Sequence, residues 1–262
     1  MAPSPSAELV VLGSGTILPR AGHGCSGYAL RPRSGAAWTL VDCGPGTVRS
    51  LGAVGIGVEQ IERVVLSHFH TDHCLDLFAL AFARRNPNLG AVPQLEVLGP
   101  PGLTDLIERA PAALGRHVED PARTVTELAA GQDGSLGFER ADLVGEGHLN
   151  GHTPNALSWR LTLPGGFVLA YSGDSGPTPG LARAARGADL FLCESAFPDG
   201  EESEHHLTPT QTGRIATAAG ARALLLTHCY PQLDPDDAAN CAGRVFAGPI
   251  ATAFDGLRVP LH

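Results

Sequence analysis

The hydrophobic residues of this chain fall mostly into short runs that are bounded by glycine, proline or polar residues. Apolar runs of about four to eight residues are typical of buried β-strands. Between residues 115 and 137 the pattern is weak, and we expect only short strands and turns there. Elsewhere the pattern predicts strands at residues 8–12, 27–31, 37–41, 63–66, 94–98, 156–163, 166–171, 188–193, 221–227, 250–254 and 257–261.

Segments with helical periodicity lie between several of these strands. The clearest helix start is at Thr208, which can cap a helix that has Pro209 at its first position and Gln211 in a capping box. Gly220 then ends that helix. We find no internal repeat and no low-complexity linker, so we expect a single domain over residues 1–262. The predicted helices cover residues 47–54, 75–85, 102–114, 209–219 and 234–246.

Composition limits the classes of function that the chain can have. It has 262 residues and is 43% hydrophobic, which is enough to bury a large core. The formal net charge of -9 disfavours general attraction to a nucleic-acid backbone, because that affinity depends on Lys and Arg. The six cysteines have no C-x-x-C spacing, and we expect them to be reduced. Without a leader-like start or a membrane-length apolar run, the sequence predicts a soluble, cytoplasmic protein with no membrane partner.

One segment contains most of the candidate metal ligands. The apolar strand at residues 63–66 is followed within a few positions by His68, His70, Asp72 and His73. Imidazole and carboxylate groups are ligands that zinc and similar cations prefer. His68 and His70 can point the same way in an extended segment, whereas Asp72 and His73 can face a second position in the turn that follows. The segment can therefore serve two cations, an interpretation that we favour over a set of solvated loop histidines.

Three later strands each lead into an ionisable residue. Asp174, Glu194 and His228 follow the strands that are predicted between residues 166 and 227. In an α/β fold, binding and catalytic residues lie at the carboxyl ends of the strands, along one edge of the sheet. We therefore expect these side chains to share an edge and to converge on the cluster at His68. A further histidine, His152, lies in a turn-rich loop before these strands.

Asp42 ends the predicted strand at residues 37–41 and precedes Gly44 and Gly46, which allow the backbone to come close. Two interpretations of this carboxylate are equally supported. It can hold a metal ligand in place as a hydrogen-bond partner. It can also stabilise a local Asx-type turn without any role in a metal site.

The motifs occur in a fixed order along the chain. They are LGSGT at 12–16, VDCGPG at 41–46, HFHTDH at 68–73, His152, SGD at 172–174, ESAF at 194–197, HLT at 206–208 and LTH at 226–228. This set resembles that of the metallo-beta-lactamase fold superfamily and, within it, the tRNase Z branch. The resemblance implies a four-layer α/β (α+β) fold, an αββα sandwich of the metallo-beta-lactamase type with a dinuclear metal site at one edge.

The resemblance also implies a set of ligands and roles. His68, His70 and His152 would hold the first metal ion, Asp72, His73 and His228 the second, and Asp174 would bridge the two. Asp72, Glu194 and His206 would form the catalytic set. The two divalent cations are expected to be Zn²⁺ because imidazoles dominate the ligands, although Mn²⁺ or Fe²⁺ would also suit them.

His206 resembles the proton donor that the tRNase Z branch supplies to the leaving group, with Glu194 fixing its orientation. A histidine suits this task because its ordinary pKa lies close to neutral pH. We prefer His206 to the adjacent His205 because His206 directly precedes the Leu207 and Thr208 of the family motif.

The chain departs from the tRNase Z family in one respect. That family inserts a long Gly- and Pro-rich arm that clamps tRNA, whereas here only a strand pair separates His152 from Asp174. Together with the net charge of -9, the lack of this arm disfavours precursor tRNA as the substrate and makes nucleic acid in general a less favoured partner. We expect a dinuclear zinc phosphodiesterase that acts on a small-molecule phosphodiester, such as a cyclic nucleotide. The alternatives are a tRNase Z-like ribonuclease, a lactone or thioester hydrolase and a metal-stabilised binding module, and the resemblance also suggests a homodimer.

Overall fold

The computed structural model describes residues 7–129 and 136–262 of the chain. These residues divide into two units that are interleaved in the sequence. Of the described residues, the first unit comprises residues 7–13, Gly24–Leu128 and Asp255–His262. The second comprises Ser14–His23, Ala129 and residues 136–254. A single domain over residues 1–262 stays a prediction.

The first unit contains a mixed sheet of seven strands in the order β14-β1-β2-β3-β4-β5-β6. The strands β3 to β6 run parallel, and the connections between them carry the helices. The strands are β1 (Ala7–Gly13), β2 (Gly27–Arg31), β3 (Trp38–Cys43), β4 (Ile61–Val65), β5 (Leu95–Gly99), β6 (Arg123–Glu127) and β14 (Arg258–Leu261). The helices are α1 (Thr47–Ala53), α2 (Thr71–Cys74), α3 (Asp76–Arg84) and α4 (Leu103–Leu114), with short 3₁₀ turns at Val58–Gln60 and Arg116–Val118.

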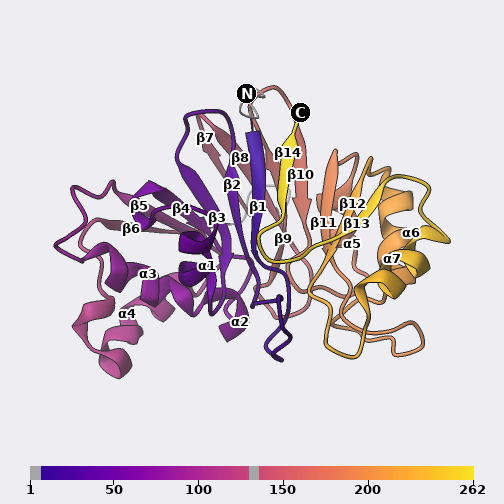
Figure 1. Ribbon diagram of the computed structural model, residues 1–262, viewed down its shortest axis with the longest axis horizontal. Coiled ribbons are helices and arrows are strands. Elements are labelled where there is room, and N and C mark those ends of the chain that lie inside the picture. Colours follow the sequence, from indigo (N-terminus) through magenta and orange to yellow (C-terminus); the bar gives the residue numbers. More distant parts are fainter. Residues whose placement is uncertain (1–6, 130–135) are drawn as a thin grey trace. The chain divides into compact units, whose positions relative to one another are not determined.

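Apolar faces of α1, α3 and α4 pack against this sheet, and Figure 1 shows these helices beside the indigo-to-magenta strands. Leu51, Leu77 and Leu103, one from each helix, are fully buried in the same cluster as Val64 and Leu66. Burying a leucine or valine side chain contributes roughly 1.5–3 kcal/mol relative to leaving it exposed. This packing fixes the end of β4, from which the histidine-rich segment begins.

The second unit contains another mixed sheet of seven strands, in the order β13-β12-β11-β10-β9-β8-β7. Here β10 to β13 are parallel, and the strands from β7 to β10 alternate in direction. The strands are β7 (Leu136–Arg140), β8 (Leu143–Leu149), β9 (Leu157–Thr162), β10 (Val168–Tyr171), β11 (Leu190–Glu194), β12 (Leu224–Thr227) and β13 (Ile250–Thr252). The helices are α5 (Pro179–Ala185), α6 (Pro209–Ala219) and α7 (Pro235–Gly243).

The start of α6 has the predicted capping box between Thr208 and Gln211, and Gly220 ends the helix in the left-handed conformation. The helices α6 and α7 lie side by side next to β12 and β13 (Figure 1). Ala216 of α6 and Ala238 of α7 are buried in the same cluster as the core residues of β11 and β12. The sheet and these helices therefore hold the carboxyl ends of β10, β11 and β12 in fixed positions.

The structure differs from the sequence prediction mainly before residue 150. The strands β7 and β8 were not predicted, because glycines interrupt the apolar alternation there. Gly145 and Gly147 make room for neighbouring side chains, since a Cβ on Gly145 would lie 2.2 Å from the ring of Phe138 and one on Gly147 would lie 2.9 Å from Leu157. The last predicted helix, at 234–246, is shorter than expected, and residues 130–135 lie outside the described residues. No helix in the described ranges is both long enough and apolar enough to cross a bilayer.

Candidate metal centre

The neighbouring parallel strands β3 and β4 end side by side in the first unit and bring Asp42 next to the histidine-rich segment. The Asp42 carboxylate is fully buried and accepts hydrogen bonds from the backbone N–H and the hydroxyl of Ser67, both at 2.7 Å. It also accepts a hydrogen bond from Nδ1 of His73 at 2.7 Å. The sequence left two interpretations of Asp42 open. The geometry favours the first of them, in which Asp42 holds the candidate metal ligand His73 in place.

Two strand ends have unusual backbone conformations. Asp42 and His228 have φ values of 56° and 55°, and they are the two non-glycine residues with positive φ in the described part of the chain. This region is sparsely populated by residues with a side chain, and such strain is found most often at functional sites. Gly44 lacks a side chain for a different reason: a Cβ there would lie 1.9 Å from the carbonyl oxygen of Asp72. The glycine thus lets β3 approach the start of α2.

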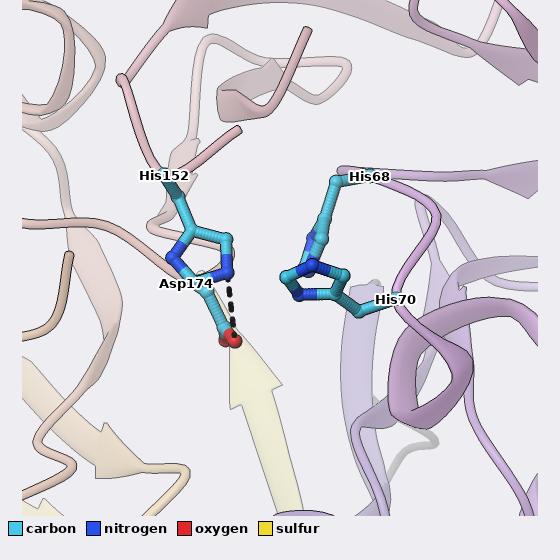
Figure 2. A group of neighbouring side chains, drawn as sticks. All are labelled: His68, His70, His152 and Asp174. Atoms are coloured by element: carbon cyan, nitrogen blue, oxygen red, sulfur yellow. Dashed lines mark ion pairs between the residues drawn. The ribbon is translucent and has the colours of Figure 1, made fainter. Parts of the chain in front are cut away.

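His68 and His70 lie close together after β4, as the spacing of the sequence suggested, with ring centroids 4.7 Å apart (Figure 2). The chain then turns into α2, which carries Asp72 and His73. Oδ2 of Asp72 lies 3.9 Å from Nε2 of His73, whose ring is 4.3 Å from that of His68. His70 is exposed, whereas the other three side chains are buried. The first unit thus gathers four candidate ligands in one place.

Hydrogen bonds at Nδ1 define which nitrogen of each imidazole can act as a ligand. The hydroxyl of Ser67 donates to Asp42, so it accepts from Nδ1 of His68 at 3.0 Å. Nδ1 of His73 donates to Asp42, and Nδ1 of His152 donates to the carbonyl oxygen of His205 at 3.0 Å. A proton on Nδ1 leaves the lone pair on Nε2, which is the arrangement found around metal-bound histidines.

The second unit brings Asp174 between two histidines. Oδ1 of Asp174 lies 3.3 Å from Nε2 of His228, and Oδ2 lies 3.7 Å from Nε2 of His152. The second of these pairs is drawn as a dashed line in Figure 2. Ligand atoms that share one tetrahedral zinc ion with bonds of about 2.0–2.2 Å lie roughly 3.3–3.6 Å apart. The spacings around Asp174 therefore suit a carboxylate that reaches two cations.

Asn150 holds the loops that carry His152 and Asp174 in position, although the sequence analysis assigned it no function. Its buried side-chain amide donates to the carbonyl oxygens of Asp174 at 2.8 Å and Ser172 at 3.2 Å. Its side-chain oxygen accepts from the backbone N–H of His152 at 3.1 Å. One side chain thus ties the loop after β8 to the loop after β10. An asparagine before a glycine is common in turns, so the sequence offered no reason to expect that Asn150 also holds two loops together.

Glu194 ends β11 and lies fully buried beside His206. Its carboxylate accepts hydrogen bonds from Nδ1 of His206 at 3.1 Å and from the backbone N–H groups of Ser175 at 2.7 Å and Leu207 at 3.2 Å. Burial raises the pKa of Glu194 to about 7, although the hydrogen bond from His206 acts in the opposite direction. Of the two adjacent histidines, it is His206 that contacts the carboxylate. Its orientation is set at Nδ1, so that Nε2 faces away from Glu194.

Two aromatic residues to which the sequence analysis assigned no role lie beside the ring of His206. Phe197 contacts it edge to face, with centroids 5.5 Å apart, and stacks on Tyr230 at 5.0 Å. Tyr230 also lies 6.3 Å from His206 and 6.0 Å from His228. Contacts between aromatic rings at these distances are directional. They favour the observed orientation of the His206 ring.

Asp42 provides a test of the support given to His73. We expect Asp42→Asn to lower the free energy of unfolding by about 1.5–3 kcal/mol, because an amide replaces a buried carboxylate that accepts three hydrogen bonds. We also expect metal affinity to fall roughly 10- to 100-fold. Urea unfolding and competition with a metal chelator measure the two effects. Asp76→Asn is the matched control, since Asp76 accepts backbone N–H groups of Gly46 and Val48 but no histidine. Equal metal affinity in both variants would contradict the role of Asp42.

The comparison with known protein families agrees with this geometry. A family model described as the beta-lactamase superfamily domain matches residues 37–229. The chain belongs to the beta-lactamase superfamily. It is therefore grouped with hydrolases of the metallo-beta-lactamase fold, and the motifs from Asp42 to His228 fall within the matched range.

Individual relatives match most of the chain. The chain is 33% identical over 246 residues to "Uncharacterized protein ML1173" from Mycobacterium leprae, covering 89% of this chain and 85% of that protein. It is 29% identical over 279 residues to a ribonuclease Z from Mycolicibacterium gilvum, covering 97% and 96%. The metallo-beta-lactamase fold protein YhfI from Bacillus subtilis matches 98% of this chain and 99% of its own, with a TM-score of 0.84 and 24% identity. The αββα fold class and the resemblance to the tRNase Z branch are confirmed.

Proposed function

We propose that this chain is a dinuclear metallo-phosphodiesterase that hydrolyses a small or cyclic nucleotide-type phosphodiester. The observation that carries the proposal is the position of Asp174, whose two carboxylate oxygens face different histidines, His228 and His152. Such a carboxylate suits a bridge between two cations. Hydrolysis of a phosphodiester is a reaction that a pair of cations serves well.

The ligand assignment follows the resemblance to the family. In this proposal His68, His70 and His152 would hold the first cation, Asp72, His73 and His228 would hold the second, and Asp174 would contact both. Zn²⁺ is the proposed metal because imidazoles dominate the set, and Mn²⁺ or Fe²⁺ would also suit it. Two such cations, when bound, offset the charge that grows on the phosphoryl oxygens and acidify the attacking water.

His206 supplies the proton that the leaving alkoxide needs. Glu194 holds Nδ1 of this imidazole, so a ring that is protonated on both nitrogens delivers its other proton from Nε2. Phe197 contacts the same ring edge to face and favours this orientation. A positioned proton donor of this kind contributes about 10²- to 10⁴-fold in rate. The contribution is largest for poor leaving groups such as ribose hydroxyls.

A ribonuclease of the tRNase Z kind is the second candidate, and the identity of 29% to a ribonuclease Z favours it. Against it stands the connection between β9 and β10, which is a tight turn closed by hydrogen bonds between Leu163 and Phe167 and between Gly166 and Leu163. An inserted arm that grips tRNA has no counterpart there. We therefore rank a small diester above precursor tRNA.

A substrate panel tests the proposal. The zinc-loaded protein is assayed with bis(p-nitrophenyl) phosphate, a 3′,5′-cyclic nucleotide, precursor tRNA with a 3′ trailer, and an acyl homoserine lactone. We expect kcat/KM for the cyclic nucleotide to exceed that for the lactone by at least about a hundredfold, because the proton donor serves an alkoxide leaving group. Preference for precursor tRNA would favour the second candidate. Preference for the lactone, or binding of metal without any turnover, would refute the phosphodiesterase assignment.

A further inference from the structure

A groove of about 800 Å³ lies on the second unit. Its walls come from residues 149–154, which follow β8, and from residues 178–180 at the start of α5. Arg183 and His205 complete the lining. A volume of this size is in the range that binds ligands as large as a nucleotide, which is about 300–1,000 Å³. The groove is therefore large enough for a part of the substrate that extends away from the reacting bond.

The groove adjoins Asp174 through His152. This residue lines the groove, and its Nε2 lies 3.7 Å from Oδ2 of Asp174. Its Nδ1 is hydrogen-bonded to the carbonyl oxygen of His205, another lining residue. A molecule whose reacting bond lies beside Asp174 therefore has the groove as a neighbouring compartment.

The walls of the groove are held firmly. Asn150 fixes the loop after β8 through its hydrogen bonds to the backbone of His152 and Asp174. Gly180 lets α5 contact this loop, because a Cβ there would lie 1.9 Å from the carbonyl oxygen of Leu149. The groove is thus built before a ligand enters, which lowers the cost of ordering on binding.

The charge of the groove is opposite to that of the chain. The chain has a net charge of -9, yet none of the described residues that line the groove carries a carboxylate. Arg183 is the cation in its wall, and no carboxylate of the described chain pairs with its guanidinium. Arg183 is also not needed to satisfy the end of α5, because Arg160 donates to the carbonyl oxygens of Ala184 and Arg186 there. The guanidinium is therefore available for an anionic ligand.

From these observations we infer that the groove binds a terminal phosphate of the substrate, remote from the diester that is cleaved, and that Arg183 recognises it. This inference rests on the proposed function and specifies its substrate class as phosphodiesters that carry an additional phosphomonoester. A guanidinium binds a phosphate through two parallel N–H···O bonds, which gives both affinity and orientation. Arg183 is then a determinant of specificity that does not touch the reacting bond.

A pair of substrates that differ only in the remote phosphate tests this inference. Thymidine 5′-(p-nitrophenyl phosphate) and its 3′-phosphorylated form have the same scissile bond and the same leaving group. We expect a KM roughly tenfold lower for the phosphorylated form, a preference that Arg183→Ala removes without changing kcat. Arg183→Lys should keep part of the preference. Arg186→Ala is the matched control, because this exposed arginine, three residues further on, is not among the described residues that line the groove.

Binding provides a readout that does not depend on turnover. We expect thymidine 3′,5′-bisphosphate to bind the wild-type protein roughly tenfold more tightly than the Arg183→Ala variant in isothermal titration calorimetry, and Arg186→Ala to bind like wild type. Equal binding to all three proteins, or an equal KM for both substrates in the wild type, would overturn the inference. If neither diester is hydrolysed but the bisphosphate still binds through Arg183, the proposed function fails while the phosphate site stands.

Discussion

Removal of the metal with a chelator is expected to lower the turnover of bis(p-nitrophenyl) phosphate by about a thousandfold or more, and added Zn²⁺ is expected to restore it. The size of the effect follows from the several kcal/mol of transition-state stabilisation that cations give to phosphoryl transfer. Asp174→Ala should produce a loss of similar size that Zn²⁺ does not restore, because this side chain faces both His152 and His228. Steady-state kinetics with metal analysis of each sample measures both effects.

Asp237→Ala is the matched control for Asp174→Ala, since Asp237 is an exposed aspartate of α7. It should leave the rate and the metal content unchanged. Full activity in a sample that contains less than a tenth of a metal ion per chain would exclude metal-dependent catalysis. Full metal content in Asp174→Ala would exclude the bridging role of this residue.

The second large effect is expected for His206→Ala, and its size should depend on the leaving group. A diester with an alkyl or ribose leaving group should lose about 10²- to 10⁴-fold in kcat, because its alkoxide leaves only with a proton. A p-nitrophenyl diester should change little, since p-nitrophenolate is stable without one. His117→Ala is the control, because His117 is exposed and contacts Phe82 in the first unit. An equal loss on both substrates would argue that His206 has a structural role.

The pH dependence of this effect follows from Glu194. Burial raises the pKa of this carboxyl to about 7, so below that pH it gains a proton and no longer accepts a hydrogen bond from Nδ1 of His206 as a carboxylate. The rate ratio of wild type to His206→Ala on the alkyl diester should therefore fall as the pH drops below about 7. Glu194→Gln should remove this dependence. A ratio that stays constant between pH 5 and pH 8 would contradict the coupling of the two residues.

The sequence predicted the strands that end in Asp174, Glu194 and His228 better than it predicted the elements around them. Asp174, Glu194 and His228 were expected at one edge because each follows an apolar run, and β10, β11 and β12 are neighbouring parallel strands with these residues at or after their ends. Strand ends are visible in a sequence because burial on both faces makes the strand uniformly apolar. The motif from His68 to His73 was visible because its residue types are rare and closely spaced.

Other features depend on contacts between distant segments and could not be predicted. Asp42 holds His73 because β3 pairs with β4, whose end leads into the segment that carries His73. The sequence around Asp42 does not show which strand will lie beside it. Asn150 acts through backbone atoms of residues more than twenty positions away, so its residue type gave no hint. The strands β7 and β8 were missed because Gly145 and Gly147 weaken the apolar pattern while serving to make room for side chains.

Anomalous X-ray diffraction from crystals of the zinc-loaded protein, recorded on both sides of the zinc absorption edge, would locate the bound cations directly. The proposal predicts two anomalous peaks per chain, about 3.5–4 Å apart, with Asp174 bound to both. One peak should be bound by His68, His70 and His152, and the other by Asp72, His73 and His228. A single peak, or two peaks that His152 and His228 do not contact, would contradict the dinuclear centre.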